Sequence, residues 1–308
     1  MNIDEVIEHI PQLRKATAVS QIHKGFSYDG KYLVYEDGDR PAYVLRTATY
    51  NQSESKRREF EAVGLIHGLG VRTSEPIAFG MIEVLDRCYM VLRYVEGLDA
   101  LEELPRMTVD QQYRVGAEAG RELLMMHEVE APEDTEAWAT HRAAKHKRHM
   151  EEYFRCGVKA PEEEAIIAFV EKHLPLLEGR PNRFQHDDFH PANLLVHHGA
   201  YVAAIDFNRY DWGDPYHDFV KIAYFSREVS IPFSIGQIDG YFDGNVPAHF
   251  WQLYALYAAM TIFGTITWTL KVVPEQLDSM MDRIRILLDD HTHFESVVPS
   301  WYKQGEHR

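Results

Sequence analysis

Cysteine is almost absent from this 308-residue sequence, which contains only Cys88 and Cys156. Two thiols so far apart cannot build the disulfide framework of a small secreted domain, and we expect both to be reduced in a cytosolic protein. Long apolar runs are missing as well. The most apolar stretch, residues 254–267, is interrupted by threonine and glycine, and it predicts a buried helix rather than a membrane span.

Positive charge is also scarce, because 32 lysine and arginine residues face 48 aspartate and glutamate residues, for a formal net charge of −16. Nucleic acid is therefore disfavoured as a partner, since phosphate binding requires a basic surface. A cationic small-molecule substrate is compatible with this balance. The first five residues, MNIDE, lack the basic and apolar segments of a signal peptide. We expect a cytoplasmic protein without a membrane partner.

The sequence does contain enough apolar residues, 45%, for a large packed core. Strands are predicted at residues 16–23, 28–36, 42–47, 76–79 and 89–94, with a helix at 53–67. Beyond Gly97 helices dominate, at residues 108–128, 136–155, 161–177, 215–226, 234–242, 247–269 and 274–290. This order predicts an α+β fold, with an antiparallel sheet lobe carrying one helix (1–95) and a larger, mainly helical lobe (96–308).

Polar residues that suit phosphoryl transfer gather in one segment, Q-H-D-D-F-H-P-A-N-L-L-V, which is followed by A-A-I-D-F. Asn193 follows Asp188 by five residues, and Asp206 follows Asn193 by thirteen. Residues 194–196 and 202–205 predict a hairpin with these groups at its mouth. Phosphoryl transfer needs one carboxylate at the attacking hydroxyl, and an amide oxygen and a second carboxylate to hold Mg²⁺. The alternative is that these residues are turn formers bonded to their own backbone.

The spacing H-x-D-x-x-x-x-N, the later I-D-F and the downstream G-D-P-Y-H-D resemble the aminoglycoside phosphotransferase family of protein-kinase-like small-molecule kinases. The resemblance implies a bilobal protein-kinase-like fold and Mg²⁺-dependent transfer of the γ-phosphoryl group of ATP or GTP to a hydroxyl. It implies that Asp188 is the catalytic base and that Asn193 and Asp206 bind the metal. His186 is expected to brace the catalytic loop rather than to transfer protons.

A kinase also needs a cation on the nucleotide phosphates and a carboxylate that holds this cation. Arg46 ends the third predicted strand, where kinases commonly carry lysine, and its planar fork suits phosphate oxygens. An ordinary strand arginine is the alternative. The carboxylate should come from the following helix. Glu59 fits the family pattern E-x-x-x-h-x-x-h-x-x-x-G-V, where h is hydrophobic, and Glu61 remains the other candidate.

Two further segments would contact the nucleotide. The turn at residues 24–30 contains Ser27, and in the family resembled here a serine and backbone amides at this place can cap phosphates. A plain hairpin turn explains this segment equally well. Residues 90–97 resemble the hinge between kinase lobes, where backbone groups near Tyr94 and Val95 would hold the adenine.

Other residues are expected to have structural roles. The resemblance places the helix that ends at His127 in the core of the helical lobe, and Asp214 and Asp218 should cap a helix that begins near Pro215. The three histidines between residues 141 and 149 stand among lysines and arginines, and this pattern predicts a solvated basic helix face rather than a zinc site.

The acceptor is the least determined part of the prediction. An aminoglycoside antibiotic fits the acidic balance and the family, which would make the protein a resistance enzyme. A macrolide, a sugar, choline or another metabolite alcohol remains open. A non-catalytic nucleotide-binding pseudokinase is a further alternative. A protein kinase is disfavoured because no long activation segment follows Asp206.

Overall fold

The computed structural model of the protein describes residues 2–24 and 29–303. Its contacts divide the chain into two compact units, each of which is described separately below. The sheet unit comprises Met1–Leu98 together with Val202–Tyr210, and the helical unit comprises Asp99–Tyr201 together with Asp211–Arg308. The chain therefore passes from one unit to the other three times.

The sheet unit is built on five antiparallel strands in the order β1-β2-β3-β5-β4. Their bounds are β1 Ala18–Gln21, β2 Gly30–Tyr35, β3 Pro41–Thr49, β4 Pro76–Ile82 and β5 Arg87–Arg93. All five strands predicted from the sequence are present. The fourth extends three residues beyond its predicted end, because the alternation of Phe79, Gly80 and Met81 is too weak to show where it stops.

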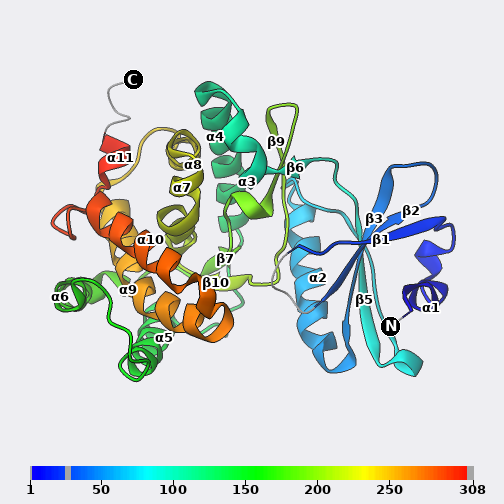
Figure 1. Cartoon of the computed structure of the whole chain (residues 1–308), viewed down its shortest axis with the longest axis horizontal. Helices are drawn as coiled ribbons and strands as arrows, with labels where there is room; N and C mark the ends of the chain where they lie inside the picture. Colours follow the sequence, from blue (N-terminus) through cyan, green and yellow to red (C-terminus); the bar gives the residue numbers. More distant parts are fainter. Residues whose placement is uncertain (1, 25–28, 304–308) are drawn as a thin grey trace. The chain divides into compact units, whose positions relative to one another are not determined.

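Helices cover both faces of this sheet (Figure 1). The long helix α2, Ser53–Gly68, was predicted, whereas the short helix α1, Ile3–Glu8, was not. Apolar residues of α1 and the turn after it pack against Leu45 and Val91 of the sheet. Side chains alternate along a strand, so Arg46, next to Leu45, points to the opposite face, where it meets α2.

The helical unit contains nine α-helices within the described residues. Their bounds are α3 Ala100–Glu103, α4 Val109–His127, α5 Trp138–Tyr153, α6 Glu163–His173, α7 Arg227–Val229, α8 Ile231–Phe242, α9 Ala248–Val272, α10 Leu277–Asp290 and α11 Ser300–Lys303. The α-helix predicted at residues 215–226 is wrong. A 3-10 helix, Pro215–Phe219, and a π-helix, Ile222–Ser226, occupy this stretch instead.

Short strands accompany these helices. The predicted hairpin is formed by β8, Leu194–His197, and β9, Ala200–Ala204. A second pair of short strands beyond Gly97 was not predicted: β7, Arg183–Gln185, pairs with β10, Asp211–Gly213. A two-residue strand, β6, Leu98–Asp99, also joins β8. Strands of two or three residues are too short to produce a periodic pattern in the sequence.

Helices α4 and α8 pack in direct backbone contact, which sequence reasoning missed. Each carries two glycines four residues apart, Gly116 and Gly120 on α4, and Gly236 and Gly240 on α8. A Cβ atom at any of the four would come within 2.1 Å of a backbone oxygen of the opposite helix. At the end of α4, His127 Nδ1 lies 2.9 Å from the Tyr241 hydroxyl of α8.

Helix α9 is the core of the helical unit, and most of its side chains are buried. Among the described residues it is the one helix whose length and composition would allow it to cross a membrane, but 72% of its most apolar window is buried inside the structure. This burial agrees with the predicted buried helix at residues 254–267.

Candidate active site

The loop at residues 186–193, which the sequence predicts to be catalytic, follows β7 in the helical unit, and the Asp218 carboxylate binds its first two residues. One carboxylate oxygen of Asp218 accepts the backbone N–H of His186 at 2.9 Å, and the other accepts that of Asp187 at 2.7 Å. His127 Nε2 also lies 3.0 Å from this carboxylate, and its Nδ1 lies 2.9 Å from the Tyr241 hydroxyl. The predicted structural role of His127 fits these buried contacts.

Asp214 and Asp218 have different roles. Asp214 caps the 3-10 helix Pro215–Phe219, as expected, by accepting the Tyr216 N–H at 3.1 Å. It also takes two hydrogen bonds from Arg180, at 2.6 and 2.8 Å. Asp218 was expected to share this capping role and does not. Its carboxylate points back to the loop, because two adjacent N–H groups there face the same buried position.

Asp188 lies at the centre of the loop with its side chain 22% exposed. Its carboxylate accepts a hydrogen bond from Asn193 Nδ2 at 3.0 Å and lies 3.0 Å from Lys221 Nζ. His190 Nε2 is 3.4 Å away. Burial raises the pKa of Asp188, but the His190 hydrogen bond and the Lys221 charge outweigh burial and hold this pKa well below its ordinary value. The carboxylate is therefore ionised at neutral pH.

The neighbouring Asp187 adopts a left-handed backbone conformation, with φ of 53°. Its carboxylate lies 3.2 Å from His217 Nδ1. Burial raises the pKa of Asp187, but the His217 hydrogen bond and charge and the charges of Lys221 and Lys145 lower it further than burial raises it. Two ionised carboxylates thus stand side by side on the loop, Asp187 facing His217 and Asp188 facing Lys221.

The sheet unit contains a second charged centre around Arg46. Its guanidinium lies 2.5 Å from Glu59 on α2, 2.6 Å from Asp29 and 3.3 Å from Asp206. Glu61, the other candidate for the partner of Arg46, is exposed. Burial lowers the pKa of Arg46, but the charges of Glu59, Asp206 and Asp29 outweigh burial and raise it.

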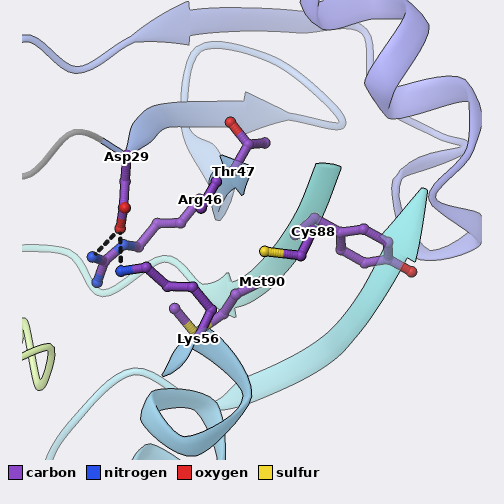
Figure 2. Close-up of a pocket in the computed structure, with 8 residues that line it drawn as sticks. Asp29, Arg46, Thr47, Lys56, Cys88 and Met90 are labelled. Atoms are coloured by element: carbon purple, nitrogen blue, oxygen red, sulfur yellow. Dashed lines mark hydrogen bonds and ion pairs between the residues drawn. The ribbon is translucent and has the colours of Figure 1, made fainter. Parts of the chain in front are cut away.

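Three residues of this centre were missed by sequence reasoning: Asp29, Lys31 and Lys56. Lys56 lies 2.6 Å from Asp29 and 3.0 Å from Glu59, and Figure 2 shows its amino group beside the Arg46 guanidinium at Asp29. Lys31 is the cross-strand neighbour of Arg46 and lies 3.4 Å from Asp206. The available signal was the pair Lys31 and Arg46 on adjacent predicted strands. Two neighbouring cations repel each other, so their pairing indicates that carboxylates lie nearby.

The six side chains, which we call the charge cluster, comprise Asp29, Lys31, Arg46, Lys56, Glu59 and Asp206. Their formal charges sum to zero. Asp29 and Glu59 are 3% and 5% exposed, whereas Asp206 is 24% exposed. Burial raises the pKa of Asp29, but Arg46 and Lys56 together lower it below its ordinary value. Removing one charged side chain from the buried side of the cluster should therefore lower the stability of the fold considerably.

Close to this cluster lies a small pocket between α2 and the sheet, with Asp29, Arg46 and Lys56 on one side and Cys88 on the other (Figure 2). Burial raises the pKa of the Cys88 thiol. Both cysteines are free, as predicted, and Cys156 is half-buried.

The other predicted nucleotide contacts lie elsewhere in the sheet unit. Tyr94 and Val95 follow β5 and are half-buried, and the Tyr94 N–H donates to the Ala42 carbonyl at 3.0 Å. That amide would therefore not be the donor to a base. Ser27 lies outside the described residues.

The proposed metal ligands offer hard oxygen donors, which is the chemistry that Mg²⁺ prefers. Asp206 supplies a partly exposed carboxylate, and its backbone is left-handed, with φ of 65°. Asn193 donates through Nδ2 to Asp188, which directs its amide oxygen away from that carboxylate. No cluster of three or more metal-ligating side chains occurs in residues 2–24 and 29–303. A few protein oxygens with waters and substrate phosphates are how Mg²⁺ is usually bound.

An antiparallel sheet with a buried Arg–Glu pair, and a helical unit with an Asp–Asn loop, define a protein-kinase-like phosphotransferase. The model of the phosphotransferase enzyme family matches residues 18–253, and the chain belongs to this family. The protein is a small-molecule kinase. No curated protein matches the sequence.

Solved structures of aminoglycoside phosphotransferases share the fold. A gentamicin complex of APH(2")-IIa is 15% identical, with a TM-score of 0.66 over 92% of this chain and 97% of that one. The GDP complex of wild-type aminoglycoside 2'-phosphotransferase-IIIa is 13% identical, with a TM-score of 0.66 over 92% and 96%. APH(4)-Ia is 17% identical, with a TM-score of 0.65 over 93% and 97%. The predicted fold class is confirmed.

Proposed function

We propose that the protein transfers the γ-phosphoryl group of ATP or GTP to a hydroxyl of a small molecule, with Mg²⁺. The observation that carries this proposal is the ionised carboxylate of Asp188, held by Asn193 Nδ2 at 3.0 Å and flanked by Lys221. A carboxylate with a low pKa is a weak base. The transition state of phosphoryl transfer is largely dissociative, so orienting the hydroxyl matters more than early removal of its proton.

In the proposed reaction the acceptor oxygen forms a bond to the γ-phosphorus while the bond to the bridging oxygen of the nucleotide breaks. The nucleoside diphosphate leaves, and the hydroxyl proton passes to Asp188 and then to solvent. Asp188 thus positions the acceptor and accepts its proton.

On the nucleotide side, the charge cluster would meet the phosphates. Arg46, braced by Glu59 at 2.5 Å, and its neighbour Lys31 provide the cations. Backbone groups near Tyr94 and Val95 would hold the base, and Ser27 would cap a phosphate. Asn193 and Asp206 would hold Mg²⁺, which neutralises charge on the phosphate oxygens.

For the acceptor, an aminoglycoside is the first candidate to test, because similar structures contain gentamicin, streptomycin and kanamycin. Resistance to such an antibiotic would be the resulting phenotype. Other alcohols, namely macrolides, sugars and choline, are the second candidates. We further propose that the protein acts in the cytoplasm, where nucleoside triphosphates are supplied. We propose no nucleic-acid or membrane partner.

The test is release of nucleoside diphosphate from MgATP and from MgGTP against a panel of these acceptors. Asp188→Asn is the control, because it keeps the size of the side chain and removes its charge. Turnover that requires an acceptor and disappears in the variant would support the proposal. Nucleotide binding without turnover on any acceptor, or turnover that Asp188→Asn leaves unchanged, would contradict it, and the former would favour a pseudokinase.

A further inference from the structure

A buried cation without a direct ion pair lies in the helical unit, and the charge of Asp187 acts on it from a distance. Arg142 of α5 is 3% exposed, and its hydrogen-bonding partner is the Thr261 hydroxyl of α9, at 3.3 Å. Its Nε atom is buried without a partner, and within the described part of the chain no carboxylate forms an ion pair with it. Burial lowers the pKa of Arg142. Buried charges are normally paired, so an unpaired one indicates a ligand.

A second cation accompanies it one turn further along the helix. Lys145 is half-buried and, among the described residues, it too has no ion-pair partner. The charge of Lys145 acts on Asp187 and on His217, and the charge of Arg142 acts on the same two residues. These two cations therefore lie within electrostatic reach of the catalytic loop.

The composition of α5 is unusual for this protein. Its residues 138–150 contain four lysines and arginines, and its two acidic residues, Glu151 and Glu152, stand in the last turn, in a chain whose net charge is −16. The sequence predicted a solvated basic face, and for Arg142 this prediction is wrong. The helix turns Arg142 inward against α9, because Thr261 there offers it a hydroxyl rather than an apolar surface.

We use the name α5 basic face for four residues of this helix: Arg142, Lys145, His146 and His149. The two histidines add neutral hydrogen-bonding groups to the two cations. Burial and the Arg142 charge lower the pKa of His146 and of His149 to about 4, so both rings are neutral at pH 7. His149 packs on Gly264 of α9, where a Cβ atom would come within 2.5 Å of its Nδ1. In Figure 1 α5 and α9 lie side by side.

We propose that the α5 basic face binds an anionic group, a carboxylate or a phosphate, of the acceptor whose hydroxyl is presented to Asp188. This rests on the proposed kinase activity, and among the acceptors to be tested it favours an anionic alcohol over a cationic aminoglycoside. A cationic acceptor would have to place ammonium groups near Arg142, Lys145 and Lys221, and like charges within a partly desolvated site repel strongly. An anionic group would give Arg142 the direct, charge-assisted hydrogen bonds that Asp187 does not make with it.

The first experiment measures anion binding independently of turnover. Thermal unfolding of the full chain with saturating MgADP is followed as inorganic phosphate is added at constant ionic strength. We expect phosphate to raise the Tm of the wild type and to raise it less in Lys145→Ala and Arg142→Met. Lys147→Ala, an exposed lysine on the same helix, is the matched control. Equal shifts in all four proteins would overturn the proposal.

Loss of folding does not obscure this result. Replacing an unpaired buried charge by an apolar side chain of similar length is often neutral or stabilising. We therefore expect Arg142→Met without phosphate to unfold at the wild-type temperature or above it. A variant that unfolds far below it would show that Arg142 is a structural cation, and this outcome also overturns the proposal.

The second experiment compares acceptors that differ in charge on one skeleton: glucose, glucosamine, gluconate and glucose 6-phosphate, with kanamycin beside them. We expect the anionic members to give the higher kcat/KM, and Lys145→Ala to raise their KM by about tenfold to a hundredfold, the value of a charge-assisted hydrogen bond. Faster turnover of kanamycin or glucosamine, improved by Lys145→Glu, would refute the anionic acceptor while leaving the kinase intact. Failure of the kinase itself would appear separately, as turnover insensitive to Asp188→Asn.

Discussion

The charge cluster allows the roles of its two paired cations, Lys31 and Arg46, to be separated. Arg46 is 7% exposed and is committed to three carboxylates at 2.5, 2.6 and 3.3 Å. Lys31 is 15% exposed, and its ion pair with Asp206 is longer, at 3.4 Å. We therefore predict that Arg46 holds the cluster together and that Lys31 supplies most of the direct attraction for the nucleotide phosphates.

The expected magnitudes differ accordingly. Arg46→Met leaves Asp29 and Glu59 buried with Lys56 as their remaining cation, and breaking a buried pair in this way costs about 3–5 kcal/mol of stability. Lys31→Met leaves Asp206, which is partly exposed, still beside Arg46, so we expect a loss of no more than about 1 kcal/mol. The same Lys31→Met change should weaken MgATP binding by about tenfold to a hundredfold, because a hydrogen bond to a charged group is lost.

Two measurements check this prediction. Urea unfolding reports the stability of each variant, and isothermal titration with MgATP reports its affinity. Lys15→Met, which removes an exposed lysine of the same unit, is the control for net charge. Arg46→Lys keeps the charge and tests affinity in a folded protein. If Lys31→Met binds MgATP as the wild type does while Arg46→Lys does not, the assignment of roles is reversed.

Three further predictions follow from the helical unit. Asp188→Asn should leave MgATP affinity unchanged and reduce kcat by about a hundredfold to ten-thousandfold, the range for general base catalysis. Steady-state kinetics would measure kcat, and isothermal titration would measure the affinity. A parallel loss of MgATP affinity would argue against this role. Gly120→Ala should lower the free energy of unfolding by about 1–3 kcal/mol, because the added Cβ would lie 2.1 Å from a backbone oxygen. Gly68→Ala is the control and should not lower it, because no atom lies within 4 Å of a Cβ added there. Equal urea midpoints for the two variants would contradict the close contact between α4 and α8. His146, with a pKa lowered from 6.5 to about 4, stabilises the fold above pH 6.5, and this contribution is lost as the pH falls towards 4 because the unfolded chain takes up the proton first. Unfolding of His146→Gln should therefore depend less on pH across that window than unfolding of the wild type or of His9→Gln, and identical pH profiles would refute the assignment.

The elements predicted correctly are those with a strong local signal. Strand β3 and helix α2 have clear apolar periodicity, and a family pattern favoured Glu59 over Glu61 as the partner of Arg46. Asp188, Asn193 and Asp206 were recognised from their spacing. Their roles remain proposals, but the loop geometry around Asp188, with Asn193 as its hydrogen-bond donor, follows the spacing of five residues.

What could not be predicted depends on contacts between distant segments. Asp29 and Lys56 are 27 residues apart, and each looks like an ordinary surface residue until the sheet and α2 pack together. The inward turn of Arg142 depends on Thr261, 119 residues away. The π-helix at Ile222–Ser226 interrupts a segment whose periodicity is helical, so the pattern predicts a regular α-helix there.

The sheet unit is completed late in synthesis, because it includes Val202–Tyr210. The backbone of this segment joins the unit at Ala204, whose N–H donates to the Arg72 carbonyl at 3.0 Å. A ribosome that has released only the first hundred residues has exposed the five strands and α2, but the cluster then holds three cations and two carboxylates. Asp206 arrives a hundred residues later and restores neutrality. In a nascent chain the cluster would therefore hold one more positive than negative charge until two thirds of the protein has been synthesised.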